Sequence, residues 1–443
     1  MDLRDYLETL KKNNELVSIK KPVSTKFEIA SLTAHLDGKQ AVVFENVKES
    51  KNKIRVAANV CGTRKRFAAA IDAKPDAIHS RVFDALSKPG KPKTEEPKFN
   101  ENTSKDLSIL PIITHFEKDA GAFITSSIVF AREQESGNQN ASVHRFLFMD
   151  ERHMAIRMVE GRHLHKCYQY AKEQGEDLKV SIVVGVHPAV MIGAAYQAAY
   201  GEDEMEIANS LMDNTLGLSR NDYSGLMVPS HAEIVIEGRI LKDRLEEEWM
   251  VEMLRTYDHK RKQPVFELES IRYRNDAIYH DILPGYAEHR LLMSMPIEAK
   301  VLQGVKNVVP TTKQVSLTDG GCNWLHAVIQ IRKRLEGESK NALIAAFAAH
   351  PSLKMAIVVD EDIDPTDAKA VEYAIATRFQ ADRDLVVIPN AKGSSLDPSS
   401  DQERLLTTKV GIDATATLLK PKDGFEIANI PGYDKIKLDD YLG

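Results

Sequence analysis

The stretch FITSSIVFAREQESGNQNASVHRFLFMDERHMAIRMVEG, Phe123 to Gly161, decides the fold class of this chain. It holds three runs rich in β-branched and aromatic residues, each of a length that suits one strand. The pair Gly137-Asn138 lies between the first two runs and is typical of a turn. We therefore expect consecutive antiparallel strands, in a central domain built as a barrel or sandwich that carries a few helices.

The sequence around this stretch extends the central domain. HLHKCYQYAKEQ, from His163, has a helical pattern, and VSIVVGV, from Val180, reads as a buried strand before a helix that opens at Pro188. Two later runs, AEIVIEGRI and PVFELESIRY, read as strands. After about Val305, strands and helices alternate, with one helix expected from Trp324 to Leu335, which predicts a separate α/β domain.

The first 87 residues mix helical and strand patterns, and the segment from Lys88 to Ser104 has the Pro, Lys and Glu content of a linker. We predict three parts: an N-terminal α/β domain with its linker (1–105), a central barrel domain (106–305) and a C-terminal α/β domain (306–443). The predicted class is thus a multidomain protein of mixed α/β and α+β type.

Composition excludes several function classes. The chain has 443 residues and a formal net charge of −6, which gives no sign of a nucleic-acid partner. Its three cysteines form no CxxC pair, so we expect no disulfide framework and no cysteine zinc site. The most apolar stretch, from Val180 to Tyr196, is interrupted by His187-Pro188 and does not read as a membrane span. We expect a cytoplasmic protein.

The common catalytic signatures are absent: no GxGxxG after a strand, no GxxxxGK[ST], no HExxH and no GxSxG. Spacing alone therefore indicates a multidomain α/β enzyme and nothing finer.

Three segments are more specific. The run IVVDEDIDPTDAKAVEYAIATRFQADRDLVVIPNAKGSSLDPS, Ile357 to Ser399, resembles the UbiD decarboxylases, and KVGIDAT, Lys409 to Thr415, resembles their closing KxGIDAT segment. QNASVHR, Gln139 to Arg145, looks like the family's cofactor strand, in which an Asn is followed five residues later by an Arg. Ordered matches run from about Asp5 to Thr415. The resemblance implies a central split barrel like that of flavin reductases, and a decarboxylase that uses prenylated FMN.

The resemblance also implies a metal site. Family members hold manganese, or magnesium, with an Asn, a His and a Glu, beside a potassium ion at the cofactor phosphate. The matching residues here are Asn140, His163 and Glu204. An amide oxygen, an imidazole and a carboxylate suit such a cation. For Glu204 taken alone, spacing favours a solvated charge of an acidic helix, because Glu202, Asp203 and Glu206 surround it.

The family's flavin contacts fall here on two segments, listed in order as Val143, His144, Arg145, Arg157, Met158, Val159, Arg162 and His163. Arginines suit phosphate or carboxylate because the guanidinium binds both in a bidentate manner. A surface role is the alternative for Arg157 and Arg162. Strand alternation places Asn140 and Arg145 on opposite faces, so we expect the strand to begin after Asn140 or to contain a bulge.

The catalytic acids of the family lie five residues apart on a loop of the form E-G-P-aromatic-G-[DE]. The register here gives Glu247 as the partner of Arg145 and Glu252 as the proton donor. This chain lacks the loop's glycines and proline, and LEEEWMVEMLRTY could instead be an amphipathic helix. Two residues five apart on a helix do not share a face, so the catalytic hypothesis needs a loop. Trp249 would then narrow the pocket.

The resemblance leaves the substrate open. The length of the chain and ILPGYAEHRLLM, Ile282 to Met293, look like the archaeal branch that decarboxylates trans-anhydromevalonate 5-phosphate in isoprenoid synthesis. Prenylated 4-hydroxybenzoates and cinnamate-like acids are alternative substrates, and a flavin-binding redox protein or a scaffold subunit is an alternative function. As partners, the resemblance implies a flavin prenyltransferase that supplies the cofactor, and a homodimer or homohexamer.

Overall fold

The computed structural model describes residues 1–443 except 135, 197, 199–200, 429 and 443. The chain forms two compact units, Met1–Ala299 and Lys300–Gly443. The first holds the N-terminal and barrel elements, and the second holds an α/β sheet, so the predicted fold class is confirmed. The three domain boundaries remain predictions.

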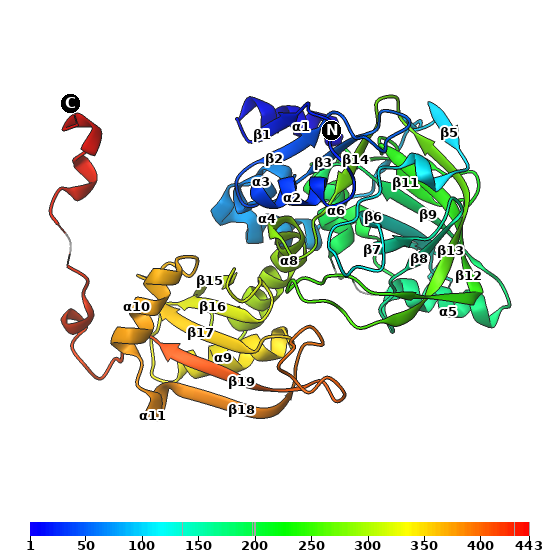
Figure 1. Cartoon of the computed structure of the whole chain (residues 1–443). Helices are drawn as coiled ribbons and strands as arrows, with labels where there is room; N and C mark the ends of the chain where they lie inside the picture. The colour runs from blue at the N-terminus through cyan, green and yellow to red at the C-terminus, as the bar shows by residue number, and fades with distance from the viewer. Residues whose placement is uncertain (135, 197, 199–200, 429, 443) are drawn as a thin grey trace. The chain divides into compact units, whose positions relative to one another are not determined.

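A closed antiparallel barrel forms the centre of the first unit (Figure 1). Its strands, in spatial order, are β12 (Ile234–Glu248), β9 (Leu178–Val184), β6 (Phe123–Arg132), β7 (Gln139–Phe148), β8 (His153–Ile156) and β13 (Arg261–Tyr273). Pairing of β12 with β13 closes the ring, and β5 (Asn102–Ser104) adds to β13. The expected hairpin is present: Gly137, with φ +74°, lies in the connection between β6 and β7.

Alternation along the strands divides the barrel residues between two cores. On β6, Val129 and Ala131 belong to one apolar cluster with Ile182 of β9, whereas Ile128 and Phe130 belong to another. The second cluster includes two helices that cover the barrel, α6 (Pro188–Ala195) and α7 (Glu204–Leu211). The barrel is therefore packed on both sides of its strands, which fixes their register.

A β-bulge interrupts this regular pairing at the position of Arg145. Ile124 pairs with Phe146 and Ser127 with His144, so β6 carries one residue more than β7 there. Strand β7 begins before Asn140, and its pairing register places the extra residue on β6. The expected bulge or late start in this strand is therefore wrong: the bulge belongs to the neighbouring strand, where it turns Thr125 toward the site described below.

The N-terminal elements complete a small sheet with a strand from later in the chain. Its order is β1 (Leu16–Ile19), β2 (Ala41–Phe44), β3 (Arg55–Ala58) and β14 (Ile278–Asp281). Its helices are α1 (Leu3–Lys12), α2 (Glu28–His35), α3 (Arg64–Ala70) and α4 (Ile78–Ser87). A second small sheet joins β4 (Lys93–Thr94), β10 (Gly217–Arg220) and β11 (Met227–Pro229). Helix α5 (His163–Glu173) matches the predicted helix, and α8 (Ala287–Lys306) leaves the first unit.

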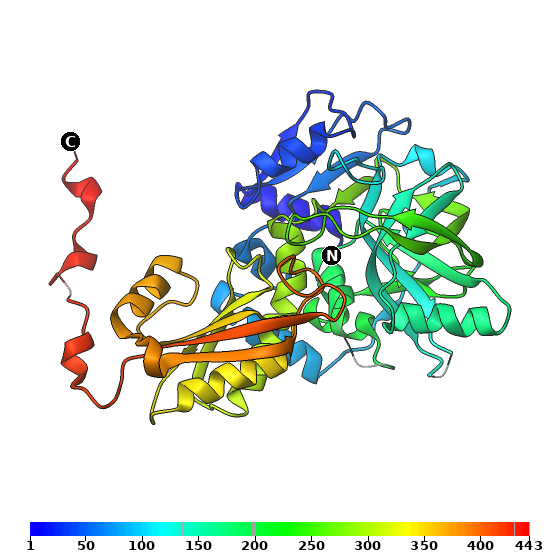
Figure 2. The ribbon, with the colours of Figure 1, turned by 60° about the horizontal axis from the view of Figure 1, so that its bottom comes forward.

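The second unit is a five-stranded mixed sheet (Figure 2). Its order is β15 (Thr312–Leu317), β16 (His326–Ile331), β17 (Met355–Asp360), β19 (Leu406–Ala414) and β18 (Leu385–Lys392). The helices α9 (Glu338–Ala349), α10 (Ala368–Arg378) and α11 (Ala381–Asp384) connect these strands. The helix predicted from Trp324 to Leu335 is wrong, because HAVIQI pairs on both sides and forms β16.

Helices α9 and α10 cover opposite faces of this sheet. Ile357 and Val359 of β17 pack with Val371 of α10, whereas Leu343 of α9 lies against Gly411, the register partner of Ala356. Within the described residues, no helix is long and apolar enough to span a membrane.

Candidate active site

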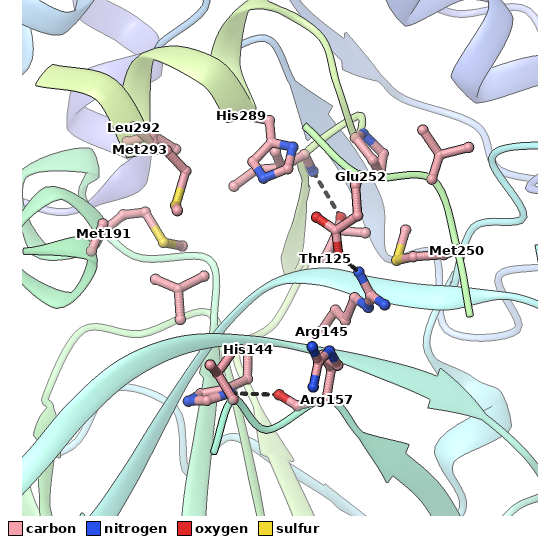
Figure 3. A pocket seen from close by; sticks show the side chains of 16 residues that line it. Thr125, His144, Arg145, Arg157, Met191, Met250, Glu252, His289, Leu292 and Met293 are labelled. Carbon is pink, nitrogen blue, oxygen red and sulfur yellow. Dashed lines mark hydrogen bonds and ion pairs between the residues drawn. The ribbon is translucent and has the colours of Figure 1, made fainter. Parts of the chain in front are cut away.

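A cavity of about 200 Å³ opens beside the β6 bulge (Figure 3). Its lining comes from β6, β7, the segment after β8, the loop after β12, α6 and α8. Arg145 and Glu252 form one side, His289 lies above them, and Met191 and Met293 lie across the space. A charged side and an apolar side thus face each other, as in sites that hold a mostly apolar ligand by one polar group.

Arg145 is the centre of the charged side. Its Nε donates to Glu248 Oε1 at 2.5 Å and its Nη2 donates to Glu248 Oε2 at 3.0 Å, a bidentate pair. Its Nη1 donates to Glu252 Oε1. The predicted partner, Glu247, is wrong: alternation at the end of β12 turns Glu247 to solvent and buries Glu248, which is 1% exposed.

The segment that carries Glu252 is a loop, as the catalytic hypothesis required. Strand β12 ends at Glu248, and the chain turns back through hydrogen bonds from Arg255 N to Glu252 O and from Glu252 N to Thr256 O. Gly285, with φ +74°, lies so close that a Cβ there would be 2.9 Å from Glu252 O. The expectation that Trp249 narrows the pocket is wrong, because its Nε1 donates to Lys118 O and Met250 and Val251 line the cavity instead.

Three carboxylates surround Arg145, and the pKa values of two of them, Glu252 and Asp258, shift in opposite directions. Burial raises the pKa of Glu252, with Asp258 adding to the effect and Arg145 opposing it. Burial would also raise the pKa of Asp258, but Arg261 and Arg145 outweigh burial and hold that pKa below its ordinary value. Glu252 is therefore the carboxyl of this group suited to carry a proton, and Asp258 is suited to stay charged.

Two neutral histidines border the cavity. Burial lowers the pKa of His144 to about 4 and that of His289 to about 4. The Nδ1 of His144 lies 2.8 Å from the Arg157 carbonyl oxygen, which can only accept, so Nδ1 carries the proton. Gly285 N donates to Nδ1 of His289 at 3.0 Å, so Nδ1 is the acceptor. The proton of the neutral His289 ring is therefore on Nε2, which can donate a hydrogen bond.

The predicted flavin contacts divide into two groups. Val143, His144, Arg145, Arg157 and Val159 line the cavity. The side chain of Met158 instead lies in the apolar core, and Arg162 and His163 lie at the start of α5, outside the cavity lining.

The three predicted metal ligands lie near one another. Asn140 Nδ2 donates to Glu204 Oε1 at 3.0 Å, and His163 Nδ1 is 3.9 Å from the same oxygen. A fourth group, Glu133, has Oε1 at 3.9 Å from His163 Nδ1; among the described residues, this buried oxygen has no hydrogen-bond partner. As the described side chains stand, no three His, Cys, Asp and Glu groups could hold a metal. Glu204 accepts from Asn140 Nδ2 and from Ala141 N.

The hydrogen bonds around Ser142 bear on the orientation of the Asn140 amide. The Ser142 hydroxyl is 3.0 Å from both Asn140 Oδ1 and His144 Nε2, two acceptors, but has a single proton. Rotating the Asn140 amide by 180° resolves the conflict, because its NH₂ group would then donate to Ser142. The amide oxygen would face Glu204 and would need a cation, or a proton on Glu204, between them. Burial raises the pKa of Glu204 to about 8. Either a cation or this proton would satisfy the contact, so Asn140, His163 and Glu204 remain the predicted ligands of a cation.

Sequence reasoning missed Glu248, Asp258, His289 and Glu133. Alternation counted back along β12 could have selected Glu248, since Glu247 and Glu248 necessarily point to opposite faces. The other three had no local signal, because only the tertiary fold brings them to Arg145, the cavity or His163.

Comparisons with known proteins give the family of the chain. Three family models match in order: the UbiD N-terminal domain at residues 7–86, the Rift-related domain of 3-octaprenyl-4-hydroxybenzoate carboxy-lyase at 87–287, and its C-terminal domain at 290–414. Anhydromevalonate phosphate decarboxylase of Methanocaldococcus jannaschii is 42% identical over 429 residues, 96% of this chain and 99% of that protein.

Solved structures extend the likeness to the whole fold. The UbiD-class enzyme HmfF from Pelotomaculum thermopropionicum, in complex with FMN, matches with a TM-score of 0.97 and 38% identity, covering 100% of both chains. An evolved dimeric form of HmfF in complex with prFMN matches with a TM-score of 0.92 and 36% identity over 100% of both chains. Since the family models together span nearly the whole chain, this protein belongs to the UbiD family of carboxy-lyases.

Proposed function

We propose that this carboxy-lyase decarboxylates trans-anhydromevalonate 5-phosphate with the help of prenylated FMN. The observation that carries the proposal is Arg145 held between Glu248 and Glu252 at the wall of a partly apolar cavity. The substrate choice is supported by the relative from M. jannaschii, which bears the name anhydromevalonate phosphate decarboxylase. Its products would be carbon dioxide and the unsaturated phosphate that keeps the remaining carbons.

Arg145 would bind the substrate carboxylate. A guanidinium has five N–H donors, and four of them are used: two on Glu248, one on Glu252 and one on Asp258. The fifth N–H belongs to Nη1, the nitrogen that also donates to Glu252. Because Glu252 lines the cavity, this N–H is the donor that a substrate would meet. The bidentate pair with Glu248 would prevent rotation of the guanidinium and so keep the carboxylate aligned.

Glu252 would supply the proton that replaces carbon dioxide. The raised pKa of this carboxyl keeps a larger share of it protonated near neutral pH than an exposed glutamate would have. The protonated group must reach the carbon that loses carbon dioxide. Its contact with Arg145 puts it beside the position proposed for the leaving carboxylate.

Prenylated FMN, when bound, supplies the electron sink that side chains cannot offer for loss of carbon dioxide from an unsaturated carbon. Apolar groups such as Val143, Met191 and Val159 would contact its rings, with His144 and Arg157 at their edge. Met158, Arg162 and His163 complete the proposed contact segments. A flavin prenyltransferase would provide this cofactor.

A manganese or magnesium ion would be held by Asn140, His163 and Glu204, next to potassium. Ligands that share one such ion at about 2.1 Å lie about 3.0 to 4.2 Å apart. Glu204 Oε1 lies 3.0 Å from Asn140 Nδ2, whose place the amide oxygen would take after the rotation described above, and 3.9 Å from His163 Nδ1. Both distances fall in that range. The cation would neutralise the cofactor phosphate, in place of a phosphate-binding loop.

We also propose a cytoplasmic homodimer or homohexamer. Several large apolar residues near the C-terminus are exposed, among them Leu419 (85%), Ile430 (71%) and Tyr441 (73%). Groups of such residues commonly mark a protein–protein contact. A second copy of the chain would cover them.

The test is an assay of the purified protein made together with a flavin prenyltransferase. We expect a bound prenylated flavin, and carbon dioxide release from trans-anhydromevalonate 5-phosphate but not from a prenylated 4-hydroxybenzoate or a cinnamate. Activity on an aromatic acid alone would refute the substrate. Plain FMN with NADH oxidation and no carbon dioxide release would refute the reaction.

A further inference from the structure

Asp258 is a third carboxylate on Arg145, at the end of the loop that carries Glu252. Its Oδ2 accepts from Arg145 Nη2 at 3.3 Å and lies 3.9 Å from Arg157 Nε. Its side chain is 8% exposed. Nothing in the proposed reaction so far requires it, since Glu248 already binds Arg145 with both oxygens.

Asp258 is itself rigidly held. Its N donates to Met250 O at 2.9 Å, and its Oδ1 accepts from His259 N at 2.8 Å and from Arg261 Nη1. The loop is thereby closed at its base, with Met250 and Asp258 side by side. The carboxylate can therefore occupy a defined position relative to Arg145, as a positioning group must.

The contact uses the second hydrogen of Nη2. With Glu248 on Nε and Nη2 and Asp258 also on Nη2, that side of the guanidinium is fully paired. Only the Nη1 side, where Glu252 binds, keeps a donor for the substrate. Asp258 thus pairs the last N–H on that side of Arg145 and leaves the free N–H on Nη1.

Asp258 also opposes the charge of Glu252. The two carboxylates share one guanidinium, and each weakens the hold of Arg145 on the other. The charged and titratable groups around Glu252 come from several elements: Arg145 of β7, Arg157 after β8, Glu248 of β12, Asp258 of the same loop, Asp119 before β6, and His289 and Arg290 of α8. Among them, Asp258 lies on the same guanidinium as Glu252, and its charge raises the pKa of Glu252.

We propose that Asp258 is a positioning residue of this reaction: it fixes Arg145 through Nη2 and sets a second carboxylate on the guanidinium that binds Glu252, the proton donor. The inference rests on the proposed function, in which Glu252 is that donor. The inference adds a role for a second carboxylate: through Arg145, Asp258 influences how readily Glu252 supplies its proton. Asp258 itself is not among the residues that line the cavity.

The experiment compares Asp258→Asn, Asp258→Glu and the parental holoenzyme, with Asp243→Asn as control because Asp243 is an exposed acid on β12. The pH dependence of kcat and KM is measured for each. Removing the negative charge should lower the pH at which Glu252 loses its proton by about one unit. The alkaline limb of kcat should move down by that amount in Asp258→Asn, and back in Asp258→Glu. Asp243→Asn should leave it in place.

A second readout does not need turnover. The infrared carboxyl band of Glu252, identified by its loss in Glu252→Gln, is titrated in the parental protein and in Asp258→Asn. We expect the same downward shift. A band and a kcat profile that do not move, or a loss of rate equal at every pH, would overturn the proposal. If Glu252→Gln still turns over, the proposed donor fails, whereas a shifted band would still support the coupling of Asp258 to Glu252.

Discussion

Replacing Glu248 by Gln removes the carboxylate that holds Arg145 most firmly. Glu248 is 1% exposed and accepts from Nε at 2.5 Å and from Nη2 at 3.0 Å. A Gln side chain keeps one acceptor oxygen, but it has no charge. Its NH₂ group would face an N–H donor of Arg145, and two donors cannot form a hydrogen bond. Breaking a buried ion pair from one side costs about 3 to 5 kcal/mol. Glu252 and Asp258 still bind Arg145 in this variant, so we expect the free energy of unfolding to fall by about 3 kcal/mol, the low end of that range.

The kinetic effect follows from the orientation of Arg145. A displacement of about 1 Å in a group that positions the substrate costs about 100-fold in rate. We therefore expect Glu248→Gln to lower kcat by about 100-fold while the protein still binds flavin. Carbon dioxide release by the reconstituted holoenzyme measures the rate, and the flavin absorbance measures cofactor content.

Glu247→Gln is the matched control, because the two residues are adjacent on β12 and only their faces differ. Glu247 is exposed, and its substitution should leave kcat within about twofold, as surface changes usually do. If Glu247→Gln lost activity while Glu248→Gln kept the parental rate, Glu248 would not be the residue that holds Arg145 in place.

Three further predictions concern the metal group and the catalytic loop. Glu133→Gln should weaken Mn²⁺ binding about tenfold or more in calorimetry, whereas the exposed Glu151→Gln should not; equal affinities would remove Glu133 from the site. The metal-free protein should lose stability as pH rises from about 4.5 toward about 8, because folded Glu204 holds its proton to about 8 whereas the unfolded chain releases it near 4.5. Thermal melts across this range should show that slope, and Glu204→Gln should flatten it; an unchanged slope would contradict the assignment. Gly285→Ala should lower kcat about 10- to 100-fold, since the new Cβ would lie 2.4 Å from Arg255 Cγ and 2.9 Å from Glu252 O; a parental rate would show that the loop tolerates the displacement.

Much of the barrel could be predicted from the sequence because its strands carry their own periodic signal. The hairpin at Gly137-Asn138 and helix α5 are examples of local patterns that the structure keeps. The run from Trp324 to Leu335 misled because HAVIQI is a short apolar run without a helical or strand period of its own. Its pairing with β15 and β17 decided its conformation.

The site was predictable where the resemblance supplied a register, as at Asn140, Arg145 and Glu252. The register alone did not give Glu248: it selected Glu247 as the partner of Arg145, and strand alternation separates the two. Asp258 and His289 were not predictable, because they reach the site through the turn at Arg255 and the start of α8. Contacts between segments far apart in sequence leave no periodic trace.

In the proposed reaction, Glu252 gives its proton to the carbon from which carbon dioxide leaves. Decarboxylation in D₂O, followed by NMR of the product, follows this proton. We expect one deuterium at that carbon with the parental holoenzyme, and flavin binding without product from Glu252→Gln. Product formed by Glu252→Gln at the parental rate, with deuterium at the same carbon, would contradict it.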